Sequence, residues 1–387
     1  MNNTQTTTAV ILAAGSSSRF WPLNGVHKGL SKLMGKPLLW YTLKTLREAG
    51  IEDVVLVQGV KRDIEKELGS SPLEGLDVRY VVQQDPMGTG AALRCALNEL
   101  PEKFLVLYGD DLYAQADIEA CRNAFPSLLA LEVENPREFG VIVPKGDMVE
   151  DIIEKPEHPP SSLANIGMYH VPKDVFLEKT GISSRGEEEL TDYIKTLAKR
   201  GGMKLIKASY WQPLSYAWSL LDACSFFMAP PYLRENQEVA IHESAVLGEG
   251  CEITGPCVIG PECKVGRGCI LEGPLSLEEG VVVGDESEIR RSIIWKRSHI
   301  GKNCKIQDSV VAEDCVVGDN VTVESKGAQG LLVRLANREA VVKRERFGMA
   351  MGAGSRVESG KSLGPAFLLE PKGELVEEQK IYDNERV

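Results

Sequence analysis

The spacing of apolar residues divides the chain into two parts with different patterns. In the first part, short apolar runs typical of buried strands alternate with segments of helical spacing. The expected strands are 9–14, 54–57, 78–82 and 104–107, and the expected helices are 33–46 and 91–100. This alternation predicts a mostly parallel sheet with helices on both faces. Ligands of such sheets bind beyond the carboxyl ends of the strands, where Gly15 and Gly109-Asp110 are expected.

The second part repeats aliphatic residues at every sixth position. The repeat runs from Ile241 to Ile289 without a miss, and after two one-residue slips it continues to Val323. A fixed six-residue period predicts a parallel β-helix in which three units form one coil. Later glycines suggest degenerate coils that extend to about residue 370: Gly352, Gly354, Gly360 and Gly364.

The change of pattern predicts two domains, residues 1–231 and 232–387. A length of 387 residues fits two hydrophobic cores better than one. A helix expected at 220–228 closes the first domain, and Pro230-Pro231 cannot continue that helix, which predicts a linker.

Most of the nine cysteines fall at one position of the repeat. Six of them follow a repeat aliphatic by four residues: Cys251, Cys257, Cys263, Cys269, Cys304 and Cys315. This spacing allows either a ladder of metal ligands or small packed thiols. No histidines are interleaved with them at the repeat spacing, and Ala245, Ser287 and Val321 fill the same position elsewhere, so packing is the favoured interpretation.

Composition and charge restrict the partners. With 43% hydrophobic and 26% charged residues the chain has the composition of a globular protein, and it lacks an apolar run long enough for a membrane helix. The polar start at residues 1–8 does not resemble a signal peptide, so we expect a cytoplasmic protein. A net charge of -12 disfavours nucleic acid and anionic membranes as partners, and a polyanionic substrate would need local cations or a metal.

The loop after the first expected strand has the composition of a phosphate-binding turn. It reads LAAGSSSRFWPL over residues 12–23. Its backbone N–H groups can surround phosphates while Arg19 and Lys28 supply positive charge.

This loop resembles the LAAGxGxRxxPL signature of nucleoside-diphosphate-sugar pyrophosphorylases, the sugar-1-phosphate nucleotidylyltransferases. Further elements of that family follow in order: Gln83, Gly88-Thr89-Gly90, Gly109-Asp110, Phe139-Gly140-Val141, Ile153-Glu154-Lys155-Pro156 and the NxGxY run from Asn165 to Tyr169. The resemblance implies a Rossmann-like nucleotidyltransferase domain followed by a left-handed parallel β-helix of hexapeptide repeats. This arrangement looks like that of bifunctional nucleotidylyltransferase/acetyltransferases.

The resemblance also implies the reaction and the role of each residue. An oxygen of a sugar 1-phosphate attacks the α-phosphorus of a nucleoside triphosphate, with UTP or dTTP favoured, and pyrophosphate leaves. Arg19 and Lys28 would stabilise the triphosphate, and Asp110 would hold Mg²⁺. The nucleotide would contact Leu12, Ala13, Ala14, Gly15, Ser16, Ser17, Ser18, Gln83, Gly88 and Thr89. The sugar phosphate would contact Gly140, Glu154, Lys155 and Asn165.

Three departures from the family pattern leave alternatives open. His27 replaces a proline, Ser17 replaces a glycine, and Pro213 stands where a second metal-binding aspartate belongs. Asp110 can still hold Mg²⁺ with substrate phosphates and water. One alternative is a noncatalytic regulatory or scaffold homologue, motivated by Pro213.

The other alternative is a bifunctional enzyme with an added amino-sugar acetyltransferase activity. The late coils contain Asn337, Lys343 and Lys361 but lack a histidine-lysine cluster, and we expect His299 to be a surface residue. Proteins with such a β-helix form homo-oligomers in the family, so we expect an oligomer, with a trimer as the implied form.

Overall fold

The computed structural model describes residues 6–69, 72–183, 186–229, 239–327, 330–335 and 338–375. Its contacts define two compact units. The first consists of Met1–Ser16 and Leu39–Pro213, and the second of Ser17–Leu38 and Leu214–Val387. The second unit therefore includes a segment from near the start of the chain. The linker expected at Pro230-Pro231 lies outside the described residues.

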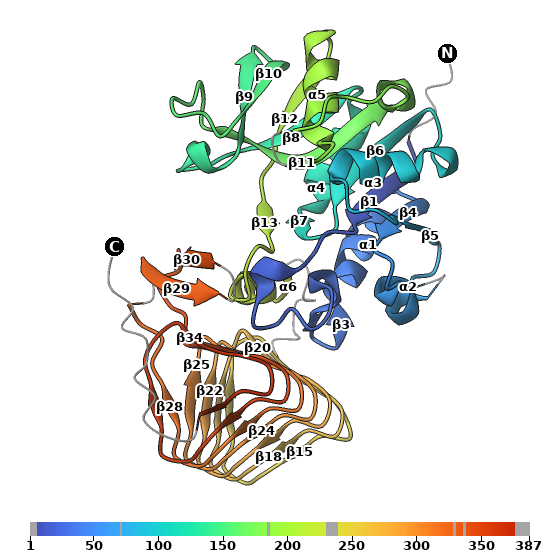
Figure 1. Ribbon diagram of the computed structural model, residues 1–387. Helices are drawn as coiled ribbons and strands as arrows, with labels where there is room; N and C mark the ends of the chain where they lie inside the picture. The colour runs from blue at the N-terminus through green and yellow to red at the C-terminus, as the bar shows by residue number, and fades with distance from the viewer. Residues whose placement is uncertain are drawn as a thin grey trace. The chain divides into compact units, whose positions relative to one another are not determined.

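The first unit contains a nine-stranded sheet in the order β5-β4-β1-β6-β11-β8-β12-β10-β9 (Figure 1). Its strands are β1 (Thr8–Ala13), β4 (Asp53–Gln58), β5 (Asp77–Val82), β6 (Lys103–Tyr108), β8 (Ser127–Glu132), β9 (Gly140–Lys145), β10 (Met148–Glu154), β11 (Leu163–Pro172) and β12 (Lys204–Lys207). The four strands predicted from the apolar runs are confirmed and pair in parallel. Because β11 pairs antiparallel with both β6 and β8, the complete sheet is mixed.

The helices of this sheet unit are α1 (Leu38–Glu48), α2 (Asp63–Leu68), α3 (Thr89–Cys95), α4 (Gln115–Asn123) and α5 (Leu190–Lys199). The second unit adds α6 (Ser219–Phe227), which confirms the helix expected at 220–228. No helix among the described residues is long and apolar enough to cross a membrane.

The helix expected at 33–46 begins later than predicted. Residues 32–37 form a tight hairpin of β2 (Lys32–Leu33) and β3 (Lys36–Pro37). At its turn, Met34 and Gly35 both have positive φ, at 50° and 78°, as a type I′ turn requires. Pro37 also disfavours helical backbone at the residue before it, so α1 starts at Leu38.

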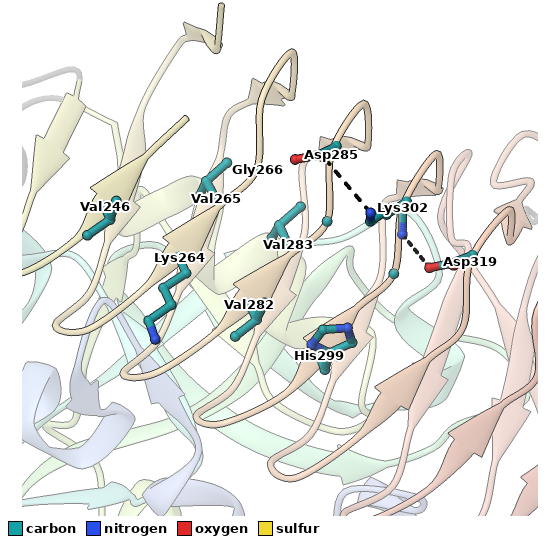
Figure 2. A pocket seen from close by; sticks show the side chains of 12 residues that line it. Val246, Lys264, Val265, Gly266, Val282, Val283, Asp285, His299, Lys302 and Asp319 are labelled. Carbon is teal, nitrogen blue, oxygen red and sulfur yellow. Dashed lines mark hydrogen bonds and ion pairs between the residues drawn. The ribbon is translucent and has the colours of Figure 1, made fainter. Parts of the chain in front are cut away.

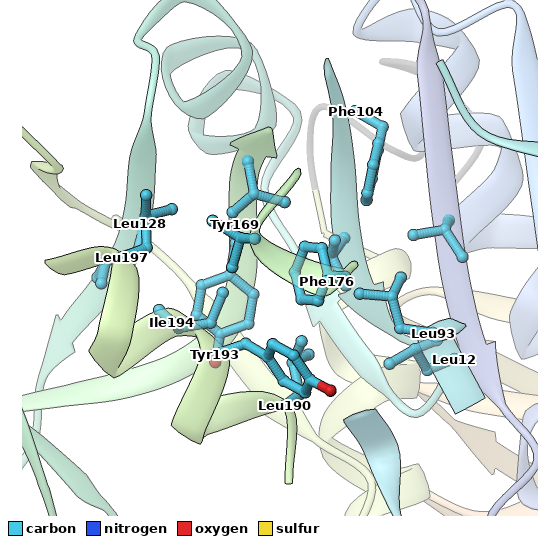
Figure 3. Packing of buried hydrophobic residues seen from close by; sticks show 14 of the residues in the cluster. Leu12, Leu93, Phe104, Leu128, Tyr169, Phe176, Leu190, Tyr193, Ile194 and Leu197 are labelled. Carbon is cyan, nitrogen blue, oxygen red and sulfur yellow. The ribbon is translucent and has the colours of Figure 1, made fainter. Parts of the chain in front are cut away.

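One hydrophobic cluster holds α3 and α5 against a face of the sheet. Figure 3 shows Leu12 and Phe104 from the strands together with Leu93 of α3 and Tyr193 of α5. Alternate residues of β1 point to opposite faces, and the whole strand is at most 7% exposed. Burial on both faces explains why this strand is a continuous apolar run.

The C-terminal part of the second unit is a three-faced parallel β-helix, consistent with the left-handed class (Figure 1). The first face contains β14 (Val239–Ile241), β17 (Cys257–Ile259), β20 (Leu275–Leu277), β23 (Ile293–Ile294), β26 (Val310–Val311), β31 (Met349–Met351) and β34 (Phe367–Leu369). The second contains β15 (Val246–Leu247), β18 (Lys264–Val265), β21 (Val282–Val283), β24 (His299–Ile300), β27 (Val316–Val317), β32 (Arg356–Val357) and β35 (Glu374–Leu375). The third contains β16 (Glu252–Thr254), β19 (Ile270–Glu272), β22 (Glu288–Arg290), β25 (Lys305–Gln307), β28 (Thr322–Val323) and β33 (Ser362–Leu363).

The six-residue repeat accounts for the register between coils. Ile241 pairs with Ile259, and Ile259 pairs with Leu277 of the next coil. After Val323 a hairpin of β29 (Leu331–Leu335) and β30 (Arg338–Val342) interrupts the helix, which resumes at Met349 and continues to Leu375. The coils thus continue through the region of the late glycines, whereas Asn337 lies outside the described residues.

The β-helix cysteines are packed thiols. Five of the six are at most 1% exposed, and Cys251 is half-buried. The Cys263 thiol donates to the Glu278 carbonyl in the next coil at 2.9 Å, and burial raises the pKa of Cys257 to about 12. Within the described residues, no group of three or more His, Cys, Asp or Glu side chains is arranged to hold a metal ion.

Candidate active site

The predicted phosphate loop and the predicted metal ligand leave neighbouring strands of the sheet. The Gly109 N–H, just after β6, donates to the Leu12 carbonyl of β1 at 2.9 Å. A Cβ atom on Gly109 would lie 2.8 Å from the Cβ of Ala13, so only glycine allows this approach. Gly15 is exposed and Asp110 is half-buried at this edge. The parallel strands therefore bring these two sequence elements together, as predicted for a ligand-binding edge.

Pro213 lies directly across a small strand pair from the carboxylates. The pair consists of β7 (Asp111–Tyr113) and β13 (Trp211–Pro213), with Pro213 opposite Asp111. Pro213 contributes no oxygen ligand from its side chain at this position. Asp111 is buried and accepts a hydrogen bond of 3.3 Å from the Tyr113 hydroxyl. Asp110 therefore offers one carboxylate that, with phosphate oxygens, fits the hard-oxygen coordination of Mg²⁺.

Asp222 does not act as a substitute ligand. It lies in α6, in the second unit, and pairs with Arg344. Burial raises the pKa of Asp222, and the Arg344 charge opposes that shift. This carboxylate is committed to joining α6 to the segment before β31.

The two predicted cations belong to the second unit. Arg19 is exposed in the short helix η1 (Ser18–Phe20), and Lys28 is half-buried in η2 (Lys28–Leu30). The Lys28 N–H donates to the Ser17 hydroxyl at 3.0 Å, which holds the start of η2 beside the residue before η1. Asp110 belongs to the first unit, so the two cations and the carboxylate are parts of different units.

Gln83 and the glycine loop after it form one local structure. The Gln83 side chain is buried, and its amide donates to the Gly88 carbonyl at 3.2 Å. Gly88 has a φ of 104°, and a Cβ atom there would lie 2.5 Å from the Glu188 carbonyl oxygen. Thr89 begins α3, and its hydroxyl accepts a hydrogen bond from the Leu190 N–H at 3.0 Å. The three predicted nucleotide-binding residues are therefore adjacent.

Three of the four predicted sugar-phosphate residues converge on one point of the sheet. Gly140 pairs with Glu154 across β9 and β10. A Cβ atom on Gly140 would lie 3.0 Å from a carboxylate oxygen of Glu154 and 3.7 Å from the Cβ of Asn165. Lys155 follows at a φ of 42° and donates its N–H to the Phe139 carbonyl at 3.0 Å. Glu154 and Lys155 are exposed, and Asn165 is half-buried.

A pair of tyrosines, Tyr108 and Tyr169, lies beside the predicted sugar-phosphate residue Asn165, and the sequence did not single it out. The Asn165 amide donates to the Tyr169 hydroxyl at 2.9 Å. The Tyr108 ring lies beside Gly167, two residues before Tyr169, because a Cβ atom on Gly167 would lie 2.3 Å from that ring. Burial raises the pKa of both tyrosines, so both hydroxyls keep their protons near neutral pH. The position of Tyr108 directly before Gly109-Asp110 is the signal that could have indicated it.

The β-helix carries a separate cavity of about 410 Å³ on its second face. Figure 2 shows Lys264, His299 and Lys302 along it, and Lys302 near Asp285 and Asp319. His299 is exposed at the start of β24, as expected for a surface residue. This cavity lies on the coils themselves and contains none of the residues predicted for nucleotidyl transfer.

Known proteins similar to this chain cover both parts. A family model described as nucleotidyl transferase matches residues 8–228, and one described as the GMPPB C-terminal domain matches residues 235–328. A bifunctional sugar-1-phosphate nucleotidylyltransferase/acetyltransferase of Sulfurisphaera tokodaii is 31% identical, over 90% of this chain and 88% of its own length. The bifunctional protein GlmU of Methanocaldococcus jannaschii is 32% identical, over 81% and 79% respectively.

Among solved structures, a similar one is a Bacillus anthracis protein assigned as a glucose-1-phosphate thymidylyltransferase, in complex with a sucrose. It is 28% identical, has a TM-score of 0.51, and covers 57% of this chain and 94% of its own. The nucleotidyl transferase match extends over more than half of the chain. The chain therefore belongs to the nucleotidyl transferase family.

Proposed function

We propose that the protein is a sugar-1-phosphate nucleotidylyltransferase that uses Mg²⁺ and releases pyrophosphate. The observation that carries this proposal is the convergence of Gly140, Glu154 and Asn165 at one point of the sheet. In the same sheet, Gly15 and Asp110 follow the carboxyl ends of the neighbouring strands β1 and β6. Gly140 leaves room for a sugar ring, and the Glu154 carboxylate and Asn165 amide beside it can bind the hydroxyl groups of that ring. The hydrogen bond from Asn165 to the buried Tyr169 hydroxyl holds the amide in place at this point.

Each predicted site residue has a separate role in this reaction. Gln83 and the backbone from Leu12 to Ser18 bind the nucleotide, beside Gly88 and Thr89, and we favour a pyrimidine base as in UTP or dTTP. Arg19 and Lys28 neutralise the triphosphate, and Lys155 binds the incoming phosphate. Asp110 would hold Mg²⁺, which supplies charge neutralisation at the phosphates when bound. Positioning and neutralisation of two polyanions are the main requirements of such a transfer.

A substrate panel tests the proposal directly. Purified protein is incubated with Mg²⁺, each of four triphosphates and a set of sugar 1-phosphates, and pyrophosphate is measured. We expect release with one pairing, a loss of at least about 100-fold in Asp110→Ala, and no loss in Asp174→Ala, whose side chain is 62% exposed. Absence of release above the Asp110→Ala level for every pairing would contradict the proposal and favour a noncatalytic homologue.

Pro213 provides a second test of the same site. Pro213→Asp would place a carboxylate opposite Asp111, at the position of the family's second metal ligand. If one carboxylate limits metal binding, this variant lowers the Mg²⁺ concentration needed for half-maximal pyrophosphate release. An unchanged Mg²⁺ requirement would show that substrate phosphates already complete the coordination.

A second candidate function is acyl transfer in the β-helix. Two relatives are named as bifunctional and match most of this chain. The cavity that contains His299, Lys264 and Lys302 is where such an activity would be sought (Figure 2). Calorimetry with acetyl-CoA decides it: binding that weakens in His299→Ala would support it, and no binding would remove it.

Assembly and location follow as parts of the proposal. We expect a homo-oligomer formed through the β-helix, with a trimer as the family form, and sedimentation of the purified chain measures this. All nine cysteines are free thiols, which suits a reducing cytoplasm.

A further inference from the structure

The segment that carries both predicted cations is held by the β-helix through a short hairpin. The Met34 N–H donates to the Ser276 hydroxyl at 3.0 Å, and the Gly35 N–H donates to a Glu278 carboxylate oxygen at 3.1 Å. The Trp295 indole N–H donates to the Lys32 carbonyl at 2.9 Å. Strand β2 and the turn of the hairpin thus meet the β-helix through directed hydrogen bonds.

The three β-helix side chains form a buried and mutually ordered group. Ser276 is fully buried, Glu278 is 5% exposed and Trp295 is 6% exposed. The Ser276 hydroxyl donates to Glu278 at 2.8 Å, and the Glu278 N–H donates to the Ile294 carbonyl of the next coil at 2.9 Å. Burial raises the pKa of Glu278, and the Gly35 N–H bond opposes this shift. A buried carboxyl is retained here although burial disfavours its charge.

The face of the β-helix that meets the hairpin differs from the other two. At outward positions of this face, Ser276, Ile293 and Val310 are all fully buried. At outward positions of the other faces, Lys264 and Lys305 are exposed. An apolar outer face requires a cover, and the hairpin supplies part of it through its hydrogen bonds to Ser276 and Glu278.

Only a few residues separate the hairpin from the cations. Lys28 precedes Lys32 by four positions, and the Ser31 N–H donates to the Lys28 carbonyl at 3.0 Å. The Leu38 N–H closes the loop by donating to the Ser31 carbonyl at 3.0 Å. The bond from Lys28 to the Ser17 hydroxyl extends this order to the residue before η1.

We propose that Glu278, with Ser276 and Trp295, is a positioning residue for nucleotidyl transfer: the β-helix fixes the hairpin and thereby the backbone from which Lys28 and Arg19 reach the triphosphate. This role rests on the proposed function of these two cations. It makes the β-helix part of the nucleotide site's support, independently of any chemistry in its own cavity.

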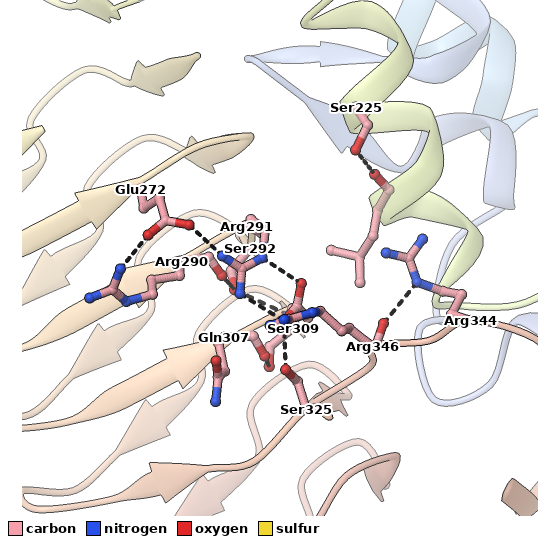
Figure 4. A network of polar contacts seen from close by, with 12 residues as sticks. Ser225, Glu272, Arg290, Arg291, Ser292, Gln307, Ser309, Ser325, Arg344 and Arg346 are labelled. Atoms are coloured by element: carbon pink, nitrogen blue, oxygen red, sulfur yellow. Dashed lines mark hydrogen bonds and ion pairs between the residues drawn. The ribbon is translucent and has the colours of Figure 1, made fainter. Parts of the chain in front are cut away.

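The test compares full-length variants that remove one buried carboxylate each. Glu278→Ala removes the acceptor of the Gly35 N–H, and Glu278→Gln keeps an oxygen acceptor there. Asp308→Asn is the matched control, because Asp308 is 2% exposed in the same β-helix and binds Arg291 and Ser325 without touching the hairpin. Figure 4 shows this network, in which Arg290 and Arg291 both pair with Glu272.

Binding of UTP, dTTP, ATP and GTP with Mg²⁺ is measured by calorimetry without sugar phosphate, together with hydrogen exchange of residues 28–38. We expect about tenfold weaker triphosphate binding in Glu278→Ala, faster exchange across the hairpin, and near wild-type values in Glu278→Gln and Asp308→Asn. With turnover, KM for the triphosphate should rise more than kcat falls.

Each outcome separates this inference from the proposed function. Equal triphosphate affinity in Glu278→Ala and wild type overturns the positioning role, as does an equal loss in Asp308→Asn or failure of the wild type to bind any triphosphate. If the wild type binds a triphosphate but releases no pyrophosphate with any sugar phosphate, the proposed function fails while the affinity ratio still decides the positioning role. If Glu278→Ala does not fold, Trp295→Phe removes the bond to Lys32 and gives the same comparison.

Discussion

Replacing Gly109 by alanine should damage both the stability and the activity of the first unit. The added Cβ would lie 2.8 Å from the Cβ of Ala13, 3.2 Å from Ile11 Cγ2 and 3.3 Å from the Leu12 carbonyl oxygen. Carbon atoms prefer a separation of about 3.5 to 4.0 Å. Two of the three neighbouring atoms have no rotamer that moves them away. The ends of β1 and β6 must therefore separate by roughly 0.7 Å or more.

The expected loss of stability is about 2 kcal/mol. Overpacking of a core typically costs about 1 to 3 kcal/mol, and the rigid neighbours of Gly109 place it near the upper end. Gly109 does not have a positive φ, so alanine recovers about 0.4 to 1 kcal/mol by restricting the unfolded chain. For a unit of this size a net loss of about 2 kcal/mol lowers Tm by about 4 to 8 °C. Displacement of Asp110 should also lower kcat by roughly 10- to 100-fold.

Calorimetric melting measures the decrease in Tm, and pyrophosphate release by the same preparations measures the decrease in kcat. Gly59→Ala is the control, because it follows the neighbouring strand β4 and its Cβ would meet only the Ala14 carbonyl at an ordinary 3.7 Å. We expect the control to melt within about 1 °C of the wild type. A Gly109→Ala protein that melts with the control and turns over normally would refute the close contact between the two strand ends.

Three further predictions concern other buried contacts. Gly167→Ala should cost about 3 kcal/mol in urea unfolding, because φ is 80° and the Cβ would lie 2.3 Å from the Tyr108 ring; a loss below about 1 kcal/mol would contradict this. Asp117→Ala should cost about 2 to 3 kcal/mol, since this 6% exposed carboxylate accepts bonds of 2.8 and 3.0 Å from the Ser209 N–H and hydroxyl; an unchanged urea midpoint would refute it. Burial raises the pKa of Glu278, so its stabilising contribution is present at low pH and is lost as pH rises through the folded-state pKa. The free energy of unfolding of E278Q, measured between about pH 4 and pH 8, should therefore exceed that of the wild type by an amount that grows with pH. A difference that stays constant with pH would contradict the expected direction of the pKa shift.

Local patterns were sufficient for the features that repeat or that end a strand. Continuous burial makes β1 and β6 apolar runs, and the glycine after each marks the turn, so Gly15 and Asp110 could be placed at one edge. The six-residue period fixed the coils because each repeat aliphatic pairs with its counterpart in the next coil. The separation is 18 residues in the first coils, as for Ile241 and Ile259, and 17 after a slip, as for Leu277 and Ile294. These features depend on residues close in sequence or on a constant spacing.

Features that depend on distant partners could not be predicted in this way. An apolar run such as β11 has the same composition whether its neighbours are parallel or antiparallel, so the mixed sheet was not foreseen. The spacing of Leu33 fits a helix, and only the turn at Met34-Gly35 and the bond to Ser276 make it a strand of a hairpin. The place of Tyr108 depends on the pairing of β6 with β11, which brings its ring against Gly167 from a distant part of the chain.

The first face of the β-helix explains why Ser17–Leu38, from near the start of the chain, belongs to the same unit as the β-helix. A β-helix coil must bury its inward aliphatics, but nothing in the repeat requires buried outward residues such as Ile293 and Val310. Their burial means that this face is stable only when covered, and the β2–β3 hairpin supplies directed bonds at its centre through Glu278 and Trp295. Because that hairpin begins four residues after Lys28, the stability of the cover and the order of the predicted phosphate cations depend on the same few hydrogen bonds.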